Sequence, residues 1–185
     1  MKGKDLIRTG RFLSLVLRHE PSAAELELDA NGWANVSDLL GFLQKKQAFT
    51  LEDLMTIVAT DNKQRFAFNQ DMSKIRANQG HSISVDLELP TSEPPEKLYH
   101  GTATKYLNKI YVEGLQSMNR QFVHLSNDIE TAITVAKRHG KPYIFEIEAK
   151  RMYDDGYTFY LSQNNVWLTD NVPTRYMRPI ITINQ

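Results

Sequence analysis

Cysteine is absent from the chain of 185 residues. Without thiols the protein can form neither disulfides nor thiolate zinc sites, and a cysteine nucleophile is excluded. No stretch approaches the roughly 20 apolar residues that a membrane-spanning helix needs. The N-terminal sequence MKGKDLIRTGRF also lacks the apolar core of a secretory signal. We therefore expect a soluble cytoplasmic protein.

An excess of either charge is also missing, because 22 basic residues balance 22 acidic ones. Net charge gives no reason for general attraction to nucleic acid or to an anionic membrane, so any anion site has to be local. Several enzyme signatures are absent as well. There is no HExxH or acidic cluster for a metal, no GxGxxG or Walker loop for a nucleotide, and no GxSxG elbow for a serine hydrolase.

The composition that remains, 41% hydrophobic and 24% charged, is typical of a globular protein. One segment interrupts it. The run DLELPTSEPPEK, residues 86–97, carries three prolines and four acids, which is typical of a linker or a surface crossing. We therefore assign residues 1–89 to a first lobe, 90–97 to a linker and 98–185 to a second lobe.

The first lobe has the pattern of three helices followed by a hairpin. One helix carries apolar residues at helical spacing and ends near His19, because the proline at position 21 disfavours helix before it. SDLLGFLQKK predicts a second helix with Ser37 as N-cap, and TLEDLMTIV a third, in which Thr50 and Asp53 resemble a capping box. RFAFNQDMSKIRA then predicts two short strands around a turn. This order is the outline of a winged helix.

The second lobe is richer in strands. KLYHG, FVHLS, YIFEIEA, NVWLT and RPIITI are short aromatic or β-branched runs. Two helices are predicted among them, at 105–112 and 128–139, each followed by a glycine. HSISVDLEL alternates apolar residues and predicts a further strand that could belong to either lobe. The predicted fold class is α+β.

Two groups of polar residues in the first lobe could carry chemistry. Arg18 and His19 end the first helix. Cations at this position are stabilised by the helix dipole, which is one interpretation. The other is a phosphate clamp, in which His19 can hold or give a proton near pH 7. Arg65 begins the first strand of the predicted hairpin and Arg76 lies in the second, and Gln79 and His81 follow in NQGHS. This polar turn could contact an RNA or DNA backbone or be a solvated hairpin end.

Two strand ends in the second lobe share one form, a histidine followed two residues later by a hydroxyl residue. These are His100-Gly101-Thr102 and His124-Leu125-Ser126. Glycine permits close backbone approach to a ligand, and the polar groups suit ribose hydroxyls and phosphates. Each histidine alone could be structural. Trp167 could stack on a ring or belong to the core.

Seven segments in this order resemble the RNA 2′-phosphotransferase family, the KptA group that includes tRNA 2′-phosphotransferases: LSLVLRHEP, LDANGWANVSDLL, KQRFAF, IRANQGHS, LYHGT, RQFVHLS and VWLT. The likeness covers nearly the whole chain. It implies a winged-helix RNA-binding lobe and an NAD-binding lobe of ADP-ribosyltransferase-like fold. It also implies that an internal RNA 2′-phosphate is moved to NAD through an ADP-ribosylated RNA phosphate.

The resemblance assigns site residues by their motifs. The catalytic set is Arg18, His19, Arg65 and Arg120, with no metal. The NAD side comprises His100, Gly101, Thr102, His124 and Ser126, together with Arg138, whose position at a helix end has the dipole explanation as an alternative. Arg76, Gln79 and His81 are candidates for the RNA side. Asn164-Asn165 stands where Asn-Gly is common in the family, and we expect its turn to form because asparagine tolerates a left-handed backbone.

The resemblance further implies a role in tRNA splicing, with NAD consumed as a reactant, and we expect a monomer. Two other functions stay open. One is a transferase that ADP-ribosylates nucleic-acid phosphate ends and stops there. The other is a winged-helix binding module with a second lobe that has lost catalysis.

Overall fold

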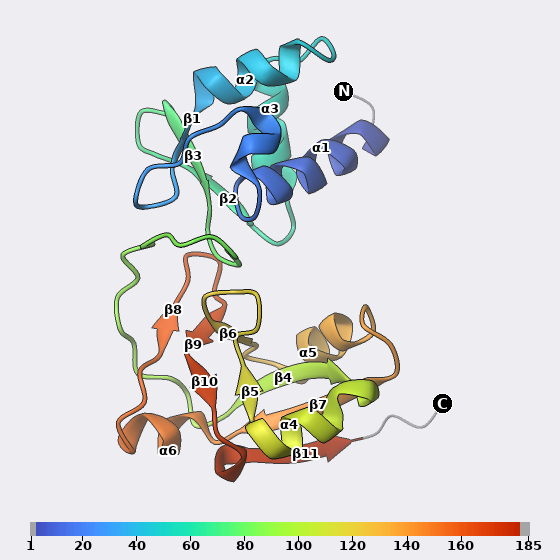
Figure 1. The fold of residues 1–185 in the computed structure, drawn as a ribbon, viewed down its shortest axis with the longest axis vertical. Coiled ribbons are helices and arrows are strands. Elements are labelled where there is room, and N and C mark those ends of the chain that lie inside the picture. The colour runs from blue at the N-terminus through green and yellow to red at the C-terminus, as the bar shows by residue number, and fades with distance from the viewer. Residues whose placement is uncertain (1–2, 182–185) are drawn as a thin grey trace. The chain divides into compact units, whose positions relative to one another are not determined.

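A computed structural model describes residues 3–181 and divides the chain into two compact units, Met1–Glu88 and Leu89–Gln185. Each unit has helices, antiparallel strands and a hydrophobic core of its own (Figure 1). The α+β class predicted from the sequence is therefore confirmed. Among residues 3–181, no helix combines the length and the apolar character needed to cross a membrane.

The helices of the first unit are α1 (Gly3–Val16), α2 (Val36–Gln44) and α3 (Leu51–Thr60), with a short 3₁₀ helix, η1, over Pro21–Ala24. The predicted capping box opens α3: the Thr50 hydroxyl accepts the Asp53 N–H at 3.1 Å, and the Asp53 carboxylate accepts the Thr50 N–H at 3.0 Å. The prediction of Ser37 as N-cap is wrong. The cap is Asn35, because the preceding strand runs directly into α2 and the Val36 N–H bonds to the Ser73 carbonyl.

A three-stranded antiparallel sheet completes this unit, with the order β1-β3-β2. Its strands are β1 (Ala34–Asn35), β2 (Phe66–Phe68) and β3 (Lys74–Ala77). The hairpin β2–β3 matches the predicted one, and β1 adds a strand on its other side. Ile75 pairs with Ala34 and Phe68 and is fully buried, so the sheet closes one face of the core formed by the helices.

The strand predicted at HSISVDLEL is wrong, because residues 81–89 are irregular in the structure. Val85 and Leu87 are buried as the alternation indicated. Within residues 3–181 no strand pairs with this stretch, and its backbone bonds singly to other segments, as when the Asp86 N–H donates to the Ala30 carbonyl at 2.8 Å. Glu88 adopts φ 52°, which also interrupts an extended chain.

In its described part, up to residue 181, the second unit contains three small antiparallel sheets. The first has the order β11-β7-β4, the second β6-β9-β8, and the third pairs β10 with β5. Their bounds are β4 Leu98–Ala103, β5 Leu115–Gln116, β6 Val123–Leu125, β7 Pro142–Ile147, β8 Tyr160–Leu161, β9 Trp167–Thr169, β10 Asn171–Val172 and β11 Met177–Ile181. All five predicted strands are present, although residues 182–183 of RPIITI lie outside the described part of the chain.

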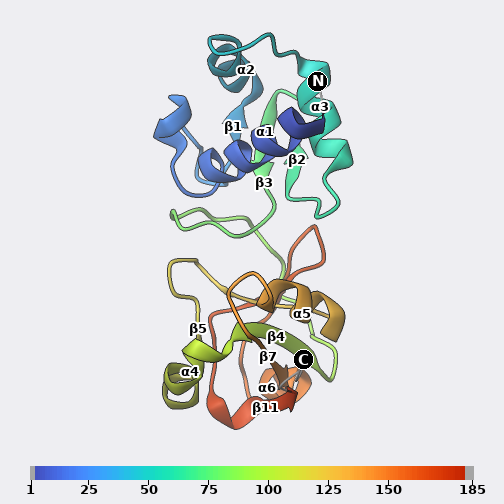
Figure 2. The same ribbon diagram turned by 90° about the vertical axis from the view of Figure 1, so that its right-hand side faces the viewer.

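The helices of the second unit are α4 (Leu107–Glu113), α5 (Ile129–Ala136) and α6 (Ala149–Asp154), with 3₁₀ turns η2 (Thr104–Tyr106) and η3 (Thr174–Tyr176). Helices α4 and α5 correspond to the two predicted ones, whereas α6 was not predicted. Helix α5 packs against β4 and β7 (Figure 2). The turn before β9 forms as expected, with Asn165 at φ 59°.

Candidate functional site

Arg18 and His19 lie in the turn that follows α1. The His19 N–H still donates to the Leu15 carbonyl at 2.8 Å, so the helical path continues past Val16 into both residues. Leu13, Val16 and Leu17 anchor this path in the core with no exposed surface. The Nε and Nη2 atoms of Arg18 are buried, whereas the His19 side chain is exposed. A buried apolar helix face therefore fixes where the two polar residues emerge.

A segment far along the chain contacts this pair. The Ser82 N–H donates to the Arg18 carbonyl at 2.9 Å, and the Ser82 hydroxyl is hydrogen-bonded to His19 Nδ1, also at 2.9 Å. Gly80 packs beside the Arg18 guanidinium, since a Cβ placed on it would come 3.5 Å from Cζ. Sequence analysis missed Ser82, although it stands in the quoted motif NQGHS.

Arg65 precedes β2 and is held by a carboxylate four residues earlier. Asp61 accepts the Arg65 N–H at 2.6 Å and forms an ion pair with the Arg65 guanidinium. The Asp61 side chain is only 8% exposed and the Arg65 side chain 34%. Arg65 also lines a groove of about 580 Å³ on the first unit, together with Arg11, Lys63 and residues of α1. Asp61 is a second residue that sequence analysis missed.

The candidates assigned to RNA differ in burial. Arg76, in β3, is 7% exposed, and its guanidinium lies over the Trp33 ring at 4.4 Å from the ring centre. His81 is 1% exposed. Gln79 is only partly buried. Burial therefore counts against direct RNA contact by Arg76 or His81, whereas Gln79 stays a candidate.

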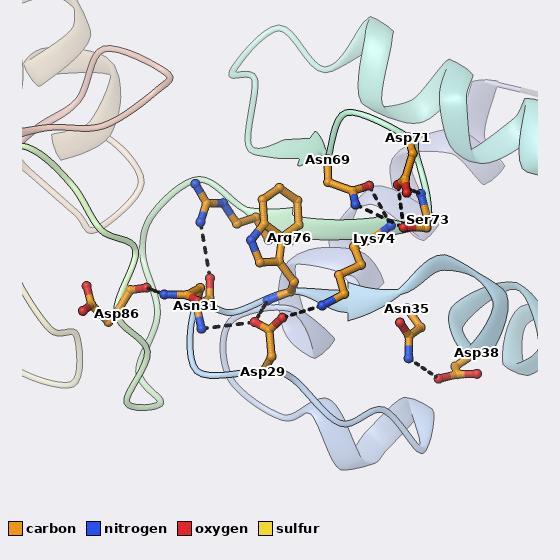
Figure 3. A network of polar contacts seen from close by, with 11 residues as sticks. Asp29, Asn31, Asn35, Asp38, Asn69, Asp71, Ser73, Lys74, Arg76 and Asp86 are labelled. Carbon is orange, nitrogen blue, oxygen red and sulfur yellow. Dashed lines mark hydrogen bonds and ion pairs between the residues drawn. The ribbon is translucent and has the colours of Figure 1, made fainter.

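A polar network explains how Arg76 is held (Figure 3). The Asp29 carboxylate accepts the backbone N–H groups of Asn31 and Trp33 at 3.1 and 3.0 Å and pairs with Lys74 of β3 at 2.8 Å. Arg76 Nη1 in turn donates to the Asn31 carbonyl at 3.4 Å. The network ties the loop before β1 to β3, which is a structural role for Arg76.

His81 is buried next to the Arg18–His19 pair. Burial first, and then the charges of Arg18, His19 and Arg76, lower the pKa of His81 from 6.5 to about 4. Neither ring nitrogen of His81 makes a hydrogen bond of regular geometry. The nearby Leu17 carbonyl favours the protonated ring and so offsets a small part of the lowering of the pKa. The imidazole is therefore neutral near pH 7 and adds no positive charge beside Arg18.

In the second unit, the two histidine strand ends lie side by side. His100 Nδ1 donates to the His124 carbonyl at 3.1 Å, and His124 Nδ1 donates to the Phe122 carbonyl at 3.0 Å. Tyr99 and Ser126 form a β-bridge between the same segments. The structure thus brings His100, His124 and Ser126 together, as the shared form of the two motifs indicated.

His100 is a neutral group in this arrangement. Burial lowers the pKa of His100, and the charges of His139 and Arg120 act in the same direction. With the proton on Nδ1, its Nε2 is an acceptor. Because the charge of Arg120 contributes to the lowered pKa of His100, Arg120 lies near this strand end, although it belongs to an irregular loop before β6.

The remaining candidates of the second unit have other surroundings. Gly101 does allow a close approach, but the approaching backbone is that of α5. Thr102 is buried at 7% exposure, and Arg138 is exposed in the turn after α5. Trp167 is also buried, at 7%, and its Nε1 donates to the Asn127 side chain at 2.8 Å, which confirms the core interpretation.

Comparison with known proteins adds a family to this geometry. The model of the RNA 2′-phosphotransferase, Tpt1 / KptA family matches residues 4–171. A probable RNA 2′-phosphotransferase of Hahella chejuensis is 51% identical over 183 residues, which covers 98% of either chain. One from Flavobacterium johnsoniae is 53% identical over 168 residues, 90% of this chain and 92% of that one. One from Fusobacterium nucleatum is 52% identical and covers 93% and 97%.

Proposed function

The chain belongs to the RNA 2′-phosphotransferase, Tpt1 / KptA family, and we propose that it transfers an internal 2′-phosphate of RNA to NAD. The predicted membership is thus confirmed, and with it the class of transferase. The dependence on NAD, the two chemical steps below and the roles of individual residues are our proposal.

In the first step, an oxygen of the RNA 2′-phosphate attacks the ribose carbon that bears nicotinamide. The carbon–nitrogen bond breaks and nicotinamide leaves, so the RNA phosphate becomes ADP-ribosylated. The phosphate is already an anion and needs no general base. The protein therefore has to align the nucleophile with the leaving group and to limit charge repulsion.

In the second step, the adjacent ribose hydroxyl attacks phosphorus and the bond from phosphorus to the RNA 2′-oxygen breaks. The proton of the attacking hydroxyl is balanced by the proton that the RNA 2′-oxygen acquires. The products are RNA with a 2′-hydroxyl and ADP-ribose 1″,2″-cyclic phosphate. Negative charge grows on the phosphoryl oxygens, where positioned cations contribute most.

Arg18, Arg65 and Arg120 are the cations in this proposal, and His19 is the donor to phosphate or to the leaving oxygen. Guanidinium groups make paired hydrogen bonds to phosphate oxygens and stay charged at any physiological pH. The observation that carries the proposal is the anchoring of Arg18 and His19 by the buried face of α1, which presents an exposed imidazole beside a partly buried guanidinium.

On the NAD side, His100, His124 and Ser126 fit a dinucleotide best. They lie at adjacent strand ends, and His100 is neutral with an acceptor nitrogen that suits a ribose hydroxyl. Gly101, on which α5 packs, and the buried Thr102 continue the strand beyond His100. Arg138 is exposed and remains a candidate for a phosphate contact.

The architecture that accompanies this function is a winged-helix lobe for RNA and an ADP-ribosyltransferase-like lobe for NAD. Three helices with a three-stranded sheet support the first, and small antiparallel sheets with α4 and α5 support the second. We propose a cytoplasmic monomer that requires no metal and acts on RNA of the tRNA type.

Mass spectrometry of a short RNA with one internal 2′-phosphate tests the function directly. Incubation with the protein and NAD should remove the phosphate and release nicotinamide and the cyclic phosphate, and without NAD the RNA should stay unchanged. Accumulation of ADP-ribosylated RNA alone would identify a transferase that stops after the first step. RNA binding without any consumption of NAD would identify a binding module.

A further inference from the structure

We propose that the segment Asn78–Ser82 is a brace that holds Arg18, His19 and Arg65 in one arrangement, with Ser82 as the positioning residue of His19. This role rests on the proposed function, because it assumes that the three residues act on the RNA phosphate. It differs from the role in RNA contact that the motif NQGHS indicated.

Ser82 makes one bond to His19 and one to Arg18. Its hydroxyl is 2.9 Å from Nδ1 of the imidazole, and its N–H donates to the Arg18 carbonyl at 2.9 Å. The backbone bond places the hydroxyl, and the hydroxyl then restrains the rotamer of His19. In the proposed arrangement the Ser82 hydroxyl donates to Nδ1, so the proton of the neutral ring is on Nε2, where it can be donated to a phosphate oxygen.

Gly80 fixes the space beside Arg18. A Cβ on Gly80 would come 3.5 Å from both Cζ and Nη1 of the guanidinium, and φ is +91°. A separation of 3.5 Å is ordinary van der Waals contact, so the position calls for glycine because of its φ, which other residues adopt only with strain. The same turn thus restrains the cation and, two residues later, the imidazole.

Asn78 connects the brace to Arg65. Its N–H donates to the Arg65 carbonyl at 2.8 Å, and its side-chain Nδ2 donates to the Gln64 carbonyl at 2.6 Å. Asn78 is 6% exposed, so these bonds are made inside the protein. The segment therefore contacts the turn after α1 through Gly80 and Ser82, and the residues just before β2 through Asn78. Such restraint matters because a displacement of about 1 Å can cost about 100-fold in rate.

Ser82→Ala is the first test, with Ser84→Ala as the matched control at an exposed position of the same segment. ¹⁵N NMR of the free protein should show a changed tautomer balance of His19 in Ser82→Ala and the wild-type balance in Ser84→Ala. The kcat for removal of the 2′-phosphate should fall about 10- to 100-fold, with KM for RNA and NAD within about 2-fold. Ser82→Thr keeps the hydroxyl and should restore both readouts.

Gly80→Ala is the second test, with Gly156→Ala as its control. Both glycines have similar backbone angles, φ +91° and +96°, but nothing lies within 4 Å of a Cβ on Gly156. Both variants should therefore lose similar stability, and only Gly80→Ala should lose about 10-fold or more in kcat.

The brace and the proposed function would be overturned by different results. If the wild-type protein consumes no NAD and leaves the RNA intact, the proposed function fails, and the NMR measurement still decides whether Ser82 orients His19. An unchanged His19 tautomer in Ser82→Ala would overturn the brace, and so would a changed tautomer with wild-type kcat.

Discussion

The backbone of α5 crosses β4 so closely that a Cβ on Gly101 would stand 1.9 Å from the carbonyl oxygen of Ala132. The Cβ of Ala136 would lie 3.2 Å away on the same side. Small residues on the helix and a glycine on the strand thus permit contact between two backbones. Gly101 of the YHGT motif therefore allows α5 to pack directly on β4, the strand that carries His100.

Gly101→Ala should be among the most destabilising single substitutions of the second unit. The added methyl has backbone as its neighbour, so α5 must shift, and we expect a loss of about 2 to 3 kcal/mol in the free energy of unfolding. Gly41→Ala in α2 is the control, since nothing lies within 4 Å there. It should stabilise by about 0.5 to 1 kcal/mol. Urea denaturation measures both, and equal effects would contradict this packing.

Stability should fall with acid because of His81. Its pKa is about 4 in the folded protein and 6.5 when unfolded, so between these values the unfolded chain binds the extra proton. The contribution of His81 to the free energy of unfolding is therefore fully present above about pH 6.5. It declines by up to about 1.4 kcal/mol per pH unit as the pH falls, and it levels off below about pH 4.

Urea denaturation of the wild-type protein and of His81→Gln, at several pH values from 4 to 8, measures this decline. The variant should show a smaller slope, because glutamine does not titrate. The slope that remains has a second source, since the pKa of His100 is lowered in the same direction. Parallel curves for the two proteins would show that the pKa of His81 is the same in the folded and unfolded states.

Asp61→Asn should impair catalysis through Arg65. The substitution removes the charge that pairs with the guanidinium while keeping one oxygen to accept the Arg65 N–H. We expect about a 10-fold fall in kcat and a loss of about 1 to 3 kcal/mol in stability, because Asp61 is nearly buried.

The control for Asp61→Asn is Glu113→Gln. Lys109 and Glu113 have the same spacing of four residues, but their side chains are 55% and 48% exposed. Stability there should change by less than about 0.5 kcal/mol and kcat should not change. Wild-type kcat in Asp61→Asn would show that Arg65 needs no carboxylate to orient it.

RNA binding should depend only weakly on salt. The 22 basic and 22 acidic residues cancel, and the proposed contacts involve one phosphate and three arginines. A plot of log K against log salt should have a slope of about −1 to −3. Fluorescence anisotropy with a labelled RNA measures it, and a slope near −6 would indicate an extended phosphate-binding surface that the charges do not suggest.

The sequence predicted most of the elements, because their signals are local. Capping at Thr50 and Asp53, the hairpin β2–β3 and the five strand patterns of the second lobe depend on neighbouring residues. The irregular stretch 81–89 was predicted wrongly because alternation reports which residues are buried, and a strand also needs a partner.

The candidate site was predictable only in part. The motifs pointed to Arg18, His19 and the two histidine strand ends, whose residue types indicate their chemistry. The supporting residues were not found, because a serine, an asparagine and an aspartate are common surface residues. Their role depends on contacts between distant positions, such as His19 with Ser82, 63 residues apart. Burial of Arg76 and His81 likewise depends on tertiary packing.

That separation of 63 residues has a kinetic consequence. A contact between positions so far apart forms only after the intervening loop has closed, and closing it costs entropy that local helices do not recover. Helix α1 can therefore form early with Arg18 and His19 unrestrained. During refolding, the circular dichroism of the helices should recover before enzymatic activity. The reason is that His19 is held in place only when the segment with Ser82, the last part of the first unit to dock, has reached it.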